Sequence, residues 1–288
     1  MRTSTFSILS TLLALASAHM QLHYPAPFNS SNNPHLGDCN ADPYLQYRQY
    51  TSHNRNQPPY ADPFLAYDCC GPNDRWMYPC RGYMSLLGTP QGAPTATWQA
   101  GTTQTWSIGG IGNHYGGSCQ VGFSVDKGQT FQVATTYEGN CPHRTNGSDP
   151  SGQTFPFTVP ADLPPGIQVF AWIWYNREQE LNMNCAAVEI TFPADSSSGT
   201  YHGSPAAHAA PSSSSGSASV AYRDRPEMLV ADDGNGCLTP HTTAELKYPA
   251  PGPEVVAGDG AYPLQLPYGT CGGVGEQAYR GETGEDGH

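Results

Sequence analysis

His19 could bind a metal ion if the chain is cleaved in front of it. Residues 1–18 have the features of a secretory signal peptide, with Arg2 at the positive end, an apolar stretch from 6 to 16, and small residues at 16–18. Cleavage after Ala18 would leave His19 as the new N-terminus. Its α-amine and imidazole could then chelate one metal ion from a single residue. The histidine could also merely follow the cleavage site, so the prediction requires a second ligand.

His114 is the second candidate ligand. It lies in the segment 112–119, Gly-Asn-His-Tyr-Gly-Gly-Ser-Cys, in which glycines stand close to the histidine on both sides. Glycine lets the backbone bend tightly, which would leave the imidazole at the surface. The segment lacks the G-x-G-x-x-G spacing of a nucleotide loop, and no helix is predicted after it. The segment is therefore not interpreted as a nucleotide loop, and His114 stays a candidate ligand.

The composition predicts a secreted, mainly β protein. The 288 residues include only 12% charged residues, together with 32 Gly, 27 Pro and nine Cys. Such a sequence is poor in the residues that stabilise helical bundles, and its net charge of −12 argues against a nucleic-acid partner. Nine cysteines favour an oxidising compartment. After the signal peptide no segment has the roughly 18 apolar residues of a membrane span, and no apolar C-terminal tail signals a lipid anchor, so we expect secretion without a membrane partner.

Short alternating segments between about 95 and 193 indicate the strands that would position the two histidines. The expected strands are 103–108, 119–125, 130–134, 154–159, 168–175 and 184–192, with a hairpin turn at 126–129. Strands of this length and spacing predict an immunoglobulin- or fibronectin-III-like antiparallel β-sandwich with long loops. A closed barrel is the alternative. Trp98, Trp106, Trp172 and Trp174 alternate as core residues do.

The sequence divides into four parts. A sandwich domain at 19–193 follows the signal peptide at 1–18. Residues 194–219 are rich in Ser, Gly and Ala, which is typical of a flexible linker. Residues 220–288 form a Pro/Gly-rich extension with Cys237 and Cys271, expected to be an irregular tail that is either a small disulfide-closed appendage or largely unfolded, with disorder from Gly272 onward.

Residues 19–193 resemble the fungal lytic polysaccharide monooxygenases, in particular the chitin-active auxiliary activity family eleven. Five blocks in the same order carry the resemblance, and the histidine at the mature N-terminus makes their combination specific. The blocks are His19-Met20, Cys80-Arg81-Gly82-Tyr83, His114-Tyr115-Gly116-Gly117-Ser118-Cys119-Gln120, Phe170-Ala171-Trp172-Ile173-Trp174-Tyr175-Asn176 and Met183-Asn184-Cys185-Ala186.

The resemblance implies that one copper ion is held in a histidine brace. His19 would bind through its amine and its ring, and His114 would supply the third nitrogen. Three nitrogen ligands with open positions suit copper, whereas zinc sites usually use three or four side chains and no such cluster is evident. The implied reaction is oxidative cleavage of glycosidic bonds in insoluble polysaccharide, chitin before cellulose, with an external electron donor and hydrogen peroxide or dioxygen. We expect a secreted monomer.

Three positions near the implied copper are compared with the family pattern; one matches it and two depart from it. Asn182 stands where the family has its axial tyrosine, which puts the axial position and the activity itself in doubt. Glu180 matches a family glutamate near the copper that would help to orient the oxygen species, although it could instead be a solvated charge at the end of a strand. Tyr115 replaces a glycine that the family prefers. If it lies on a strand, its side chain should point away from the ligand face.

The resemblance also implies disulfides, but the sequence alone cannot derive the pairing. Cys80 would pair with Cys185, Cys119 with Cys141, and Cys237 with Cys271. Cys39, Cys69 and Cys70 remain, so one of them must be unpaired. Neighbouring cysteines rarely bridge each other, and we therefore expect Cys39 to pair with one of the other two, with Cys69 as the partner that we name.

Two further hypotheses compete with a polysaccharide monooxygenase. One is a secreted copper-binding protein without oxidative cleavage, motivated by Asn182. The other is a carbohydrate-binding sandwich in which neither histidine holds a metal. On the secretory route, the sequons at Asn29 and Asn146 are candidate glycosylation sites.

Overall fold

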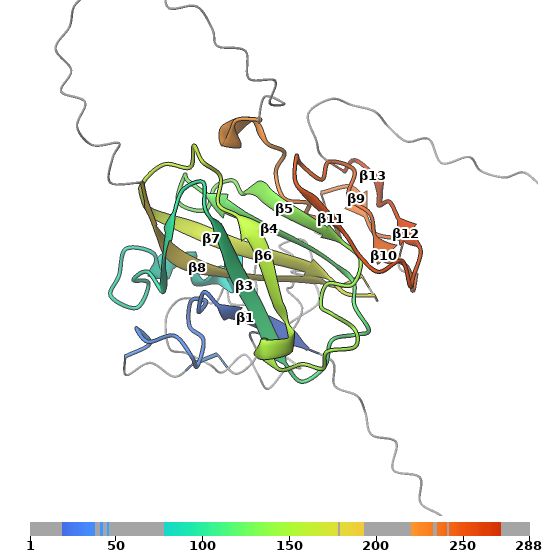
Figure 1. The fold of residues 1–288 in the computed structure, drawn as a ribbon, viewed down its shortest axis with the longest axis horizontal. Coiled ribbons are helices and arrows are strands. Elements are labelled where there is room, and N and C mark those ends of the chain that lie inside the picture. Colours follow the sequence, from blue (N-terminus) through green and yellow to red (C-terminus); the bar gives the residue numbers. More distant parts are fainter. Residues whose placement is uncertain are drawn as a thin grey trace, which may run out of the picture.

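Two β-sheets pack face to face in the structure, a computed structural model (Figure 1). It describes residues 19–37, 41–42, 45, 78–177, 179–192, 220–232, 235–240 and 242–271. The predicted signal peptide, the predicted linker and the last residues from Gly272 onward lie outside the described residues. Among the described residues, no helix is both long enough and apolar enough to cross a membrane.

The larger sheet has six strands in the order β11-β5-β4-β7-β8-β2. Its four central strands are antiparallel to one another, whereas the edge strands β2 and β11 run parallel to β8 and β5. The strand bounds are β2 Ala96–Gln99, β4 Ser118–Ser124, β5 Gln132–Glu138, β7 Gly166–Tyr175, β8 Leu181–Thr191 and β11 Val255–Ala257.

The smaller sheet has three antiparallel strands in the order β1-β3-β6 and crosses in front of the larger one in Figure 1. Its strands are β1 Met20–Tyr24, β3 Thr103–Gly110 and β6 Thr154–Thr158. The two layers confirm the predicted β-sandwich. The predicted hairpin turn joins β4 to β5, with positive φ at Lys127 and Gly128.

The larger sheet is buried on both faces, which explains why β7 consists almost entirely of apolar residues. Along β7, Phe170, Trp172 and Trp174 face the smaller sheet, while the alternate residues face a second apolar layer on the other side. Trp98 lies in the inter-sheet core with its ring centroid 5.1 Å from that of Phe170. All four predicted core tryptophans are at most 1% exposed, so that prediction is confirmed.

The second apolar layer is made of loops, one 3₁₀ helix and short strands. On this face, the 3₁₀ helix η4 (Cys80–Leu86) packs against β8. Two other short helices, η5 (Pro150–Gly152) and η7 (Tyr222–Asp224), lie before β6 and at the start of the C-terminal segment.

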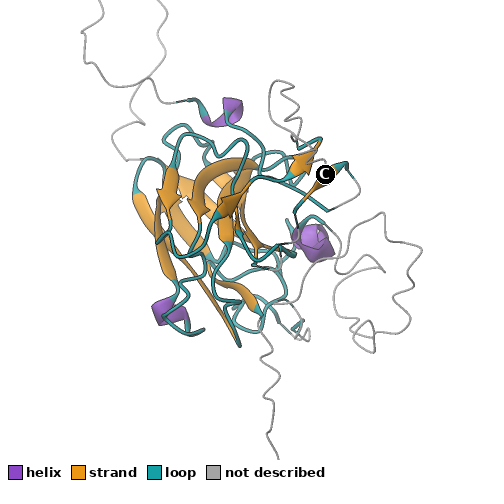
Figure 2. Cartoon of the chain, turned by 90° about the vertical axis from the view of Figure 1, so that its right-hand side faces the viewer, coloured by secondary structure: helices purple, strands orange, loops and turns teal. Residues whose placement is uncertain are grey.

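Residues 220–271 pack onto the sandwich, although the composition had suggested a separate appendage or an unfolded tail. This segment contributes the edge strand β11 to the main sheet and supplies Met228, Leu246 and Tyr248 to the second apolar layer. It also contains four short strands, seen beside β5 and β11 in Figure 1: β9 Cys237–Leu238, β10 Glu245–Leu246, β12 Leu264–Gln265 and β13 Tyr268–Gly269. Figure 2, turned by 90° from Figure 1, shows the strands in the middle of the molecule with loops around them.

The described residues form three disulfides, with the pairings that the family resemblance implied. They join Cys80 to Cys185, Cys119 to Cys141, and Cys237 to Cys271. The first links η4 to β8, and the third closes a loop within the C-terminal segment. Cys39, Cys69 and Cys70 lie outside the described residues, so their pairing stays a prediction.

Candidate active site

His19 and His114 lie beside each other, although 95 positions separate them in the sequence. Their ring centroids are 6.0 Å apart and the ring planes are inclined by 75°. Strand β1 causes this approach, because it pairs with β3 from Met20 opposite Gly110. The backbone N–H of Ile111 then donates to the carbonyl of His19 at 3.0 Å, which brings the loop after β3 alongside.

His114 occupies a tight turn, not a strand. Its φ is +46° and that of Tyr115 is +56°, and the N–H of Gly116 donates to the carbonyl of Asn113 at 2.9 Å. Two successive non-glycine residues in the left-handed region are uncommon and costly. The expectation that Tyr115 points away because it lies on a strand is therefore corrected: Tyr115 is at a turn and its side chain is 66% exposed.

The side chain of Asn113 anchors this turn to the loop after β5. Its NH₂ group donates to the carbonyls of His143 and Arg144, each at 3.0 Å. Its oxygen accepts a hydrogen bond from the N–H of Tyr115 at 3.1 Å. One asparagine thus bonds within the turn and across to a neighbouring loop, which restricts the position of His114.

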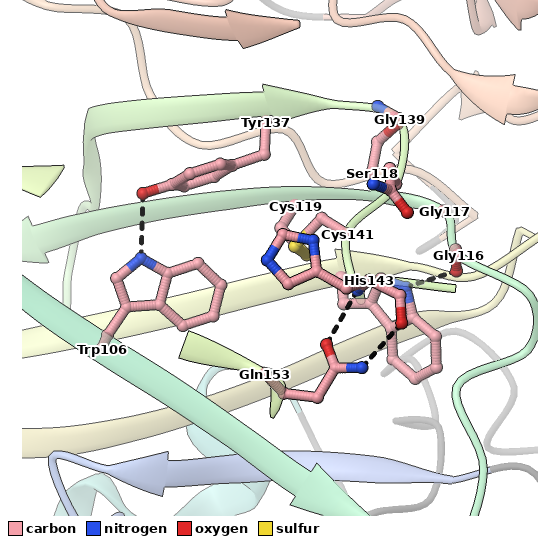
Figure 3. Close-up of a disulfide and its surroundings, with 12 residues drawn as sticks. Trp106, Gly116, Gly117, Ser118, Cys119, Tyr137, Gly139, Cys141, His143 and Gln153 are labelled. Atoms are coloured by element: carbon pink, nitrogen blue, oxygen red, sulfur yellow. Dashed lines mark hydrogen bonds between the residues drawn. A yellow bond between two sulfur atoms is a disulfide. The ribbon is translucent and has the colours of Figure 1, made fainter. Parts of the chain in front are cut away.

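Trp174 and a disulfide pack next to the turn that carries His114. The Trp174 ring centroid lies 5.4 Å from that of His114, and its Nε1 donates to the carbonyl of Gly116 at 3.2 Å. Gly117 fits only because it has no side chain, since a Cβ there would lie 2.3 Å from the carbonyl oxygen of Tyr175. The disulfide between Cys119 and Cys141 lies just beyond these glycines (Figure 3).

Asn176 links His114 to Glu180. Its side-chain nitrogen donates to Oε2 of Glu180 at 3.1 Å and lies 3.5 Å from Nδ1 of His114. Its oxygen accepts from the backbone N–H of Glu180 at 2.9 Å. Asn176 is completely buried, and no motif in the sequence predicts it as a site residue. The available signal was an asparagine directly after the predicted strand, four positions before the candidate glutamate.

Asn182 lies on β8 opposite Trp174. Its side chain is 4% exposed, and its NH₂ group donates to the backbone carbonyl of Glu180 at 3.2 Å. The structure therefore gathers His19, His114 and Glu180, with Asn182 bonded to the backbone of Glu180. Among the described residues, no group of three or more His, Cys, Asp or Glu side chains is placed to hold a metal ion.

The surroundings of His19 lower the pKa of its imidazole. The main cause is burial, which disfavours the charged ring, and the nearby ring of His114 acts in the same direction. The carboxylate of Glu180 opposes both effects. The ring of His19 therefore stays neutral to a lower pH than a free histidine, which keeps a lone pair available for a ligand.

The two sequons lie in different environments. Asn29 is only 3% exposed and has a φ of +56°, so a glycan there would have to displace packed residues. Asn146 is exposed in the loop before η5. Of the two predicted glycosylation sites, Asn146 is the one that the folded protein leaves accessible.

Comparison with known proteins places this arrangement in a family. No protein-family model matches the chain. AA11 family lytic polysaccharide monooxygenase A of Aspergillus fumigatus is 34% identical over 228 residues, which covers 78% of this chain and 80% of that protein. Lytic polysaccharide monooxygenase B of the same species is 30% identical over 237 residues, covering 78% of this chain and 51% of that protein.

Among solved structures, T.fusca AA10A is 20% identical and covers 60% of this chain and 100% of that chain, with a TM-score of 0.30. The relationship is carried by the sequence, since the identity to monooxygenase A extends over most of both chains. The chain belongs to the AA11 family of lytic polysaccharide monooxygenases, which are copper-dependent oxidoreductases.

Proposed function

We propose that the chain, once cleaved after Ala18, holds one copper ion between His19 and His114. The ligands would be the amine and ring of His19 and the ring of His114. The observation that carries the proposal is the approach of the two imidazoles, with ring centroids 6.0 Å apart. Ring nitrogens bind such metals at about 2 Å, so one ion fits between two rings at this separation. Three nitrogens with open positions match the preference of copper.

Glu180 and Asn176 would organise the space beside the metal. Bound copper would supply the oxidising centre that removes a hydrogen atom from C1 or C4 of a sugar, using an external electron donor and hydrogen peroxide or dioxygen. Asn176 holds the carboxylate of Glu180 in place by a hydrogen bond from its side-chain nitrogen at 3.1 Å. From that position Glu180 can accept a hydrogen bond from a small oxygen co-substrate and so orient it.

The surface around the two histidines suits an insoluble polysaccharide, and we propose chitin before cellulose. Ile111 and Tyr115, on either side of His114, are 60% and 66% exposed. These side chains are uncharged and belong to the segments that carry the proposed ligands. Aromatic faces pack well on sugar rings at little entropic cost. We also propose that the enzyme is secreted as a monomer, because an enzyme must leave the cell to reach a solid substrate outside it.

The test of this function is the production of oxidised oligosaccharides from solid chitin. The mature protein, loaded with copper and supplied with a reductant, is expected to release products carrying oxidised C1 or C4 ends, detected by mass spectrometry. Copper binding without such products on chitin and cellulose would support the alternative of a copper-binding protein. Absence of copper binding would support a carbohydrate-binding sandwich without metal.

A substitution at Asn182 tests whether this residue limits the activity. The variant Asn182→Tyr returns the phenol that the family carries at this position. It is expected to leave copper affinity within about threefold of the parent, because it changes none of the three proposed nitrogen ligands, and to raise product yield. The measurement is the rate of oxidised product formation at equal copper loading. An Asn182→Tyr variant no more active than the parent would show that Asn182 does not limit the reaction.

A further inference from the structure

Residues 242–245, here termed the bridging segment, connect the two loops that carry His114 and Glu180. The segment precedes and enters β10, in the part of the chain whose composition had suggested an appendage. At one end, the side chain of Glu245 bonds to the His114 turn. At the other end, Thr242 bonds to the loop that precedes Glu180. Four consecutive residues therefore connect both sides of the site.

The carboxylate of Glu245 is buried and heavily hydrogen-bonded. Glu245 is 1% exposed. Its Oε1 accepts from the backbone N–H of Gly117 at 3.1 Å, from that of Asn140 at 2.9 Å, and from Nη2 of Arg144 at 3.0 Å. A buried charge requires such partners to offset its desolvation, and hydrogen bonds to an ionised acceptor are stronger than neutral ones.

Glycines leave the space that this carboxylate fills. A Cβ at Gly116 would lie 2.6 Å from Oε1 of Glu245, and a Cβ at Gly139 would lie 2.6 Å from Oε2. Both glycines have positive φ, +111° and +89°. The His114 turn and the end of β5 are thus shaped around the carboxylate, so the glycines after His114 serve this contact as well as the turn itself.

Arg144 connects Glu245 to the other side of the His114 turn by hydrogen bonds. Its Nη1 donates to the carbonyl of Tyr115 at 2.6 Å, next to His114. Its other nitrogens bond to both oxygens of Asp259, at 2.8 and 2.7 Å. Glu245 and Arg144 together hold the carbonyl of Tyr115 and the N–H of Gly117.

The same segment holds the loop before Glu180. The Nε of Arg177 donates to the carbonyl of Thr243 at 3.0 Å. Gln179, which is 1% exposed and has a φ of +62°, donates to the carbonyl of Ala244 and accepts from the N–H of Thr242, both at 3.3 Å. The two loops are therefore attached to one piece of backbone.

We propose that Glu245 is a positioning residue that fixes the His114 turn relative to His19. The turn places two non-glycine residues in an unfavourable backbone region, so its geometry depends on contacts from outside the turn. The buried carboxylate supplies such contacts from a segment that also fixes the Glu180 loop. The significance of this role for metal binding rests on the proposed function.

Glu245→Gln in the full mature protein tests this role. It removes the charge that pairs with Arg144 and replaces one oxygen by an amide nitrogen, with almost no change in size. Glu254→Gln is the matched control, because Glu254 lies on the same C-terminal segment and pairs with Arg225 at 3.7 Å, away from the site. Arg144→Lys is a second variant, which keeps the charge but loses the forked contacts to Tyr115 and Glu245.

Hydrogen exchange of the copper-free proteins is measured first, by mass spectrometry of peptides covering 113–118. Glu245→Gln and Arg144→Lys are expected to raise the exchange rate there about tenfold or more, since the first weakens and the second removes charge-assisted hydrogen bonds, while Glu254→Gln stays near the parent. Cu²⁺ alone is then titrated into each protein. The copper affinity is expected to fall about tenfold in Glu245→Gln and Arg144→Lys only. An effect of this size is typical when a residue that supports a metal ligand is lost.

The outcomes separate the two proposals. Unchanged exchange in both Glu245→Gln and Arg144→Lys would overturn the positioning role. Faster exchange in these variants, with copper affinity equal to that of the parent, would also overturn it. Glu245 would then stabilise the turn without affecting where His114 is placed. If the parent itself does not bind copper, the proposed function fails, and the exchange rates alone decide whether Glu245 fixes the turn.

Discussion

Adding one alanine in front of His19 is expected to abolish tight copper binding and the release of oxidised products. The extra residue converts the α-amine of His19 into a peptide nitrogen, which carries no available lone pair. The strand pairing of β1 begins at Met20, so the fold does not depend on a free amine at His19. Loss of a direct ligand should weaken binding by on the order of 100-fold or more, beyond the effect of losing a neighbouring support. Isothermal titration with Cu²⁺ measures it.

Two single substitutions provide the matching comparison. His114→Ala should weaken copper binding as strongly as the added alanine, because each removes one of three nitrogens. His23→Ala is the control, since His23 lies on β1, the strand that follows His19, and is exposed. Parent-like copper affinity in the alanine-extended protein, with its N-terminus verified by mass spectrometry, would contradict the proposed role of the His19 amine.

The strands of the sandwich could be predicted because each leaves a short alternating or apolar segment between turn residues. The expected strand 168–175 corresponds to β7, Gly166–Tyr175, and 119–125 corresponds to β4, Ser118–Ser124. Both strands lie in the middle of a sheet that is covered on its two faces. β7 is mostly apolar, as expected for such a strand, whereas β4 alternates apolar residues with small or polar ones. Local composition alone was therefore sufficient for these elements.

The C-terminal segment could not be predicted in this way. Strands such as β9 and β10 have two residues each, too few for any periodic pattern. Single long-range bonds hold the segment instead, for example from the N–H of Leu229 to the side-chain oxygen of Gln120 at 2.8 Å. Such pairs follow from the three-dimensional fold and leave no signal in a neighbouring stretch of sequence.

The candidate site shows the same division. His19 and His114 could be predicted, because a cleavage site and a glycine-rich segment mark them locally. Asn176 and Glu245 could not, because their roles depend on which loops the sandwich brings together. The tight bend at His114 could also be predicted, whereas its detailed backbone geometry could not. The glycines after it permit a turn, but the positive φ of His114 itself is imposed by contacts made through Asn113 and Arg144.

The disulfide between Cys80 and Cys185 stabilises the part of the fold that supports His19. It joins residues separated by 105 positions, and both cysteines are 2% exposed. Beside it, the N–H of Phe28 donates to the carbonyl of Cys185 at 2.8 Å, and the N–H of Leu22 donates to the side chain of Asn184, also at 2.8 Å. The segment that begins with His19 is thus fastened to β8 next to this bridge.

Replacing both Cys80 and Cys185 with alanine is therefore expected to lower the free energy of unfolding by about 4–5 kcal/mol, because a long loop is released in the unfolded chain. The matched control, Cys237→Ala with Cys271→Ala, opens a loop of separation 34 and should cost about 3–4 kcal/mol. Double replacement leaves no new free thiol from the broken pair to exchange with the unpaired cysteine. Guanidinium unfolding of the two variants and the parent, without reductant, measures both losses. A smaller loss for the Cys80 and Cys185 pair than for the control would show that loop length does not set their order. The bridge beside β1 would then contribute less to stability than the one that closes the C-terminal segment.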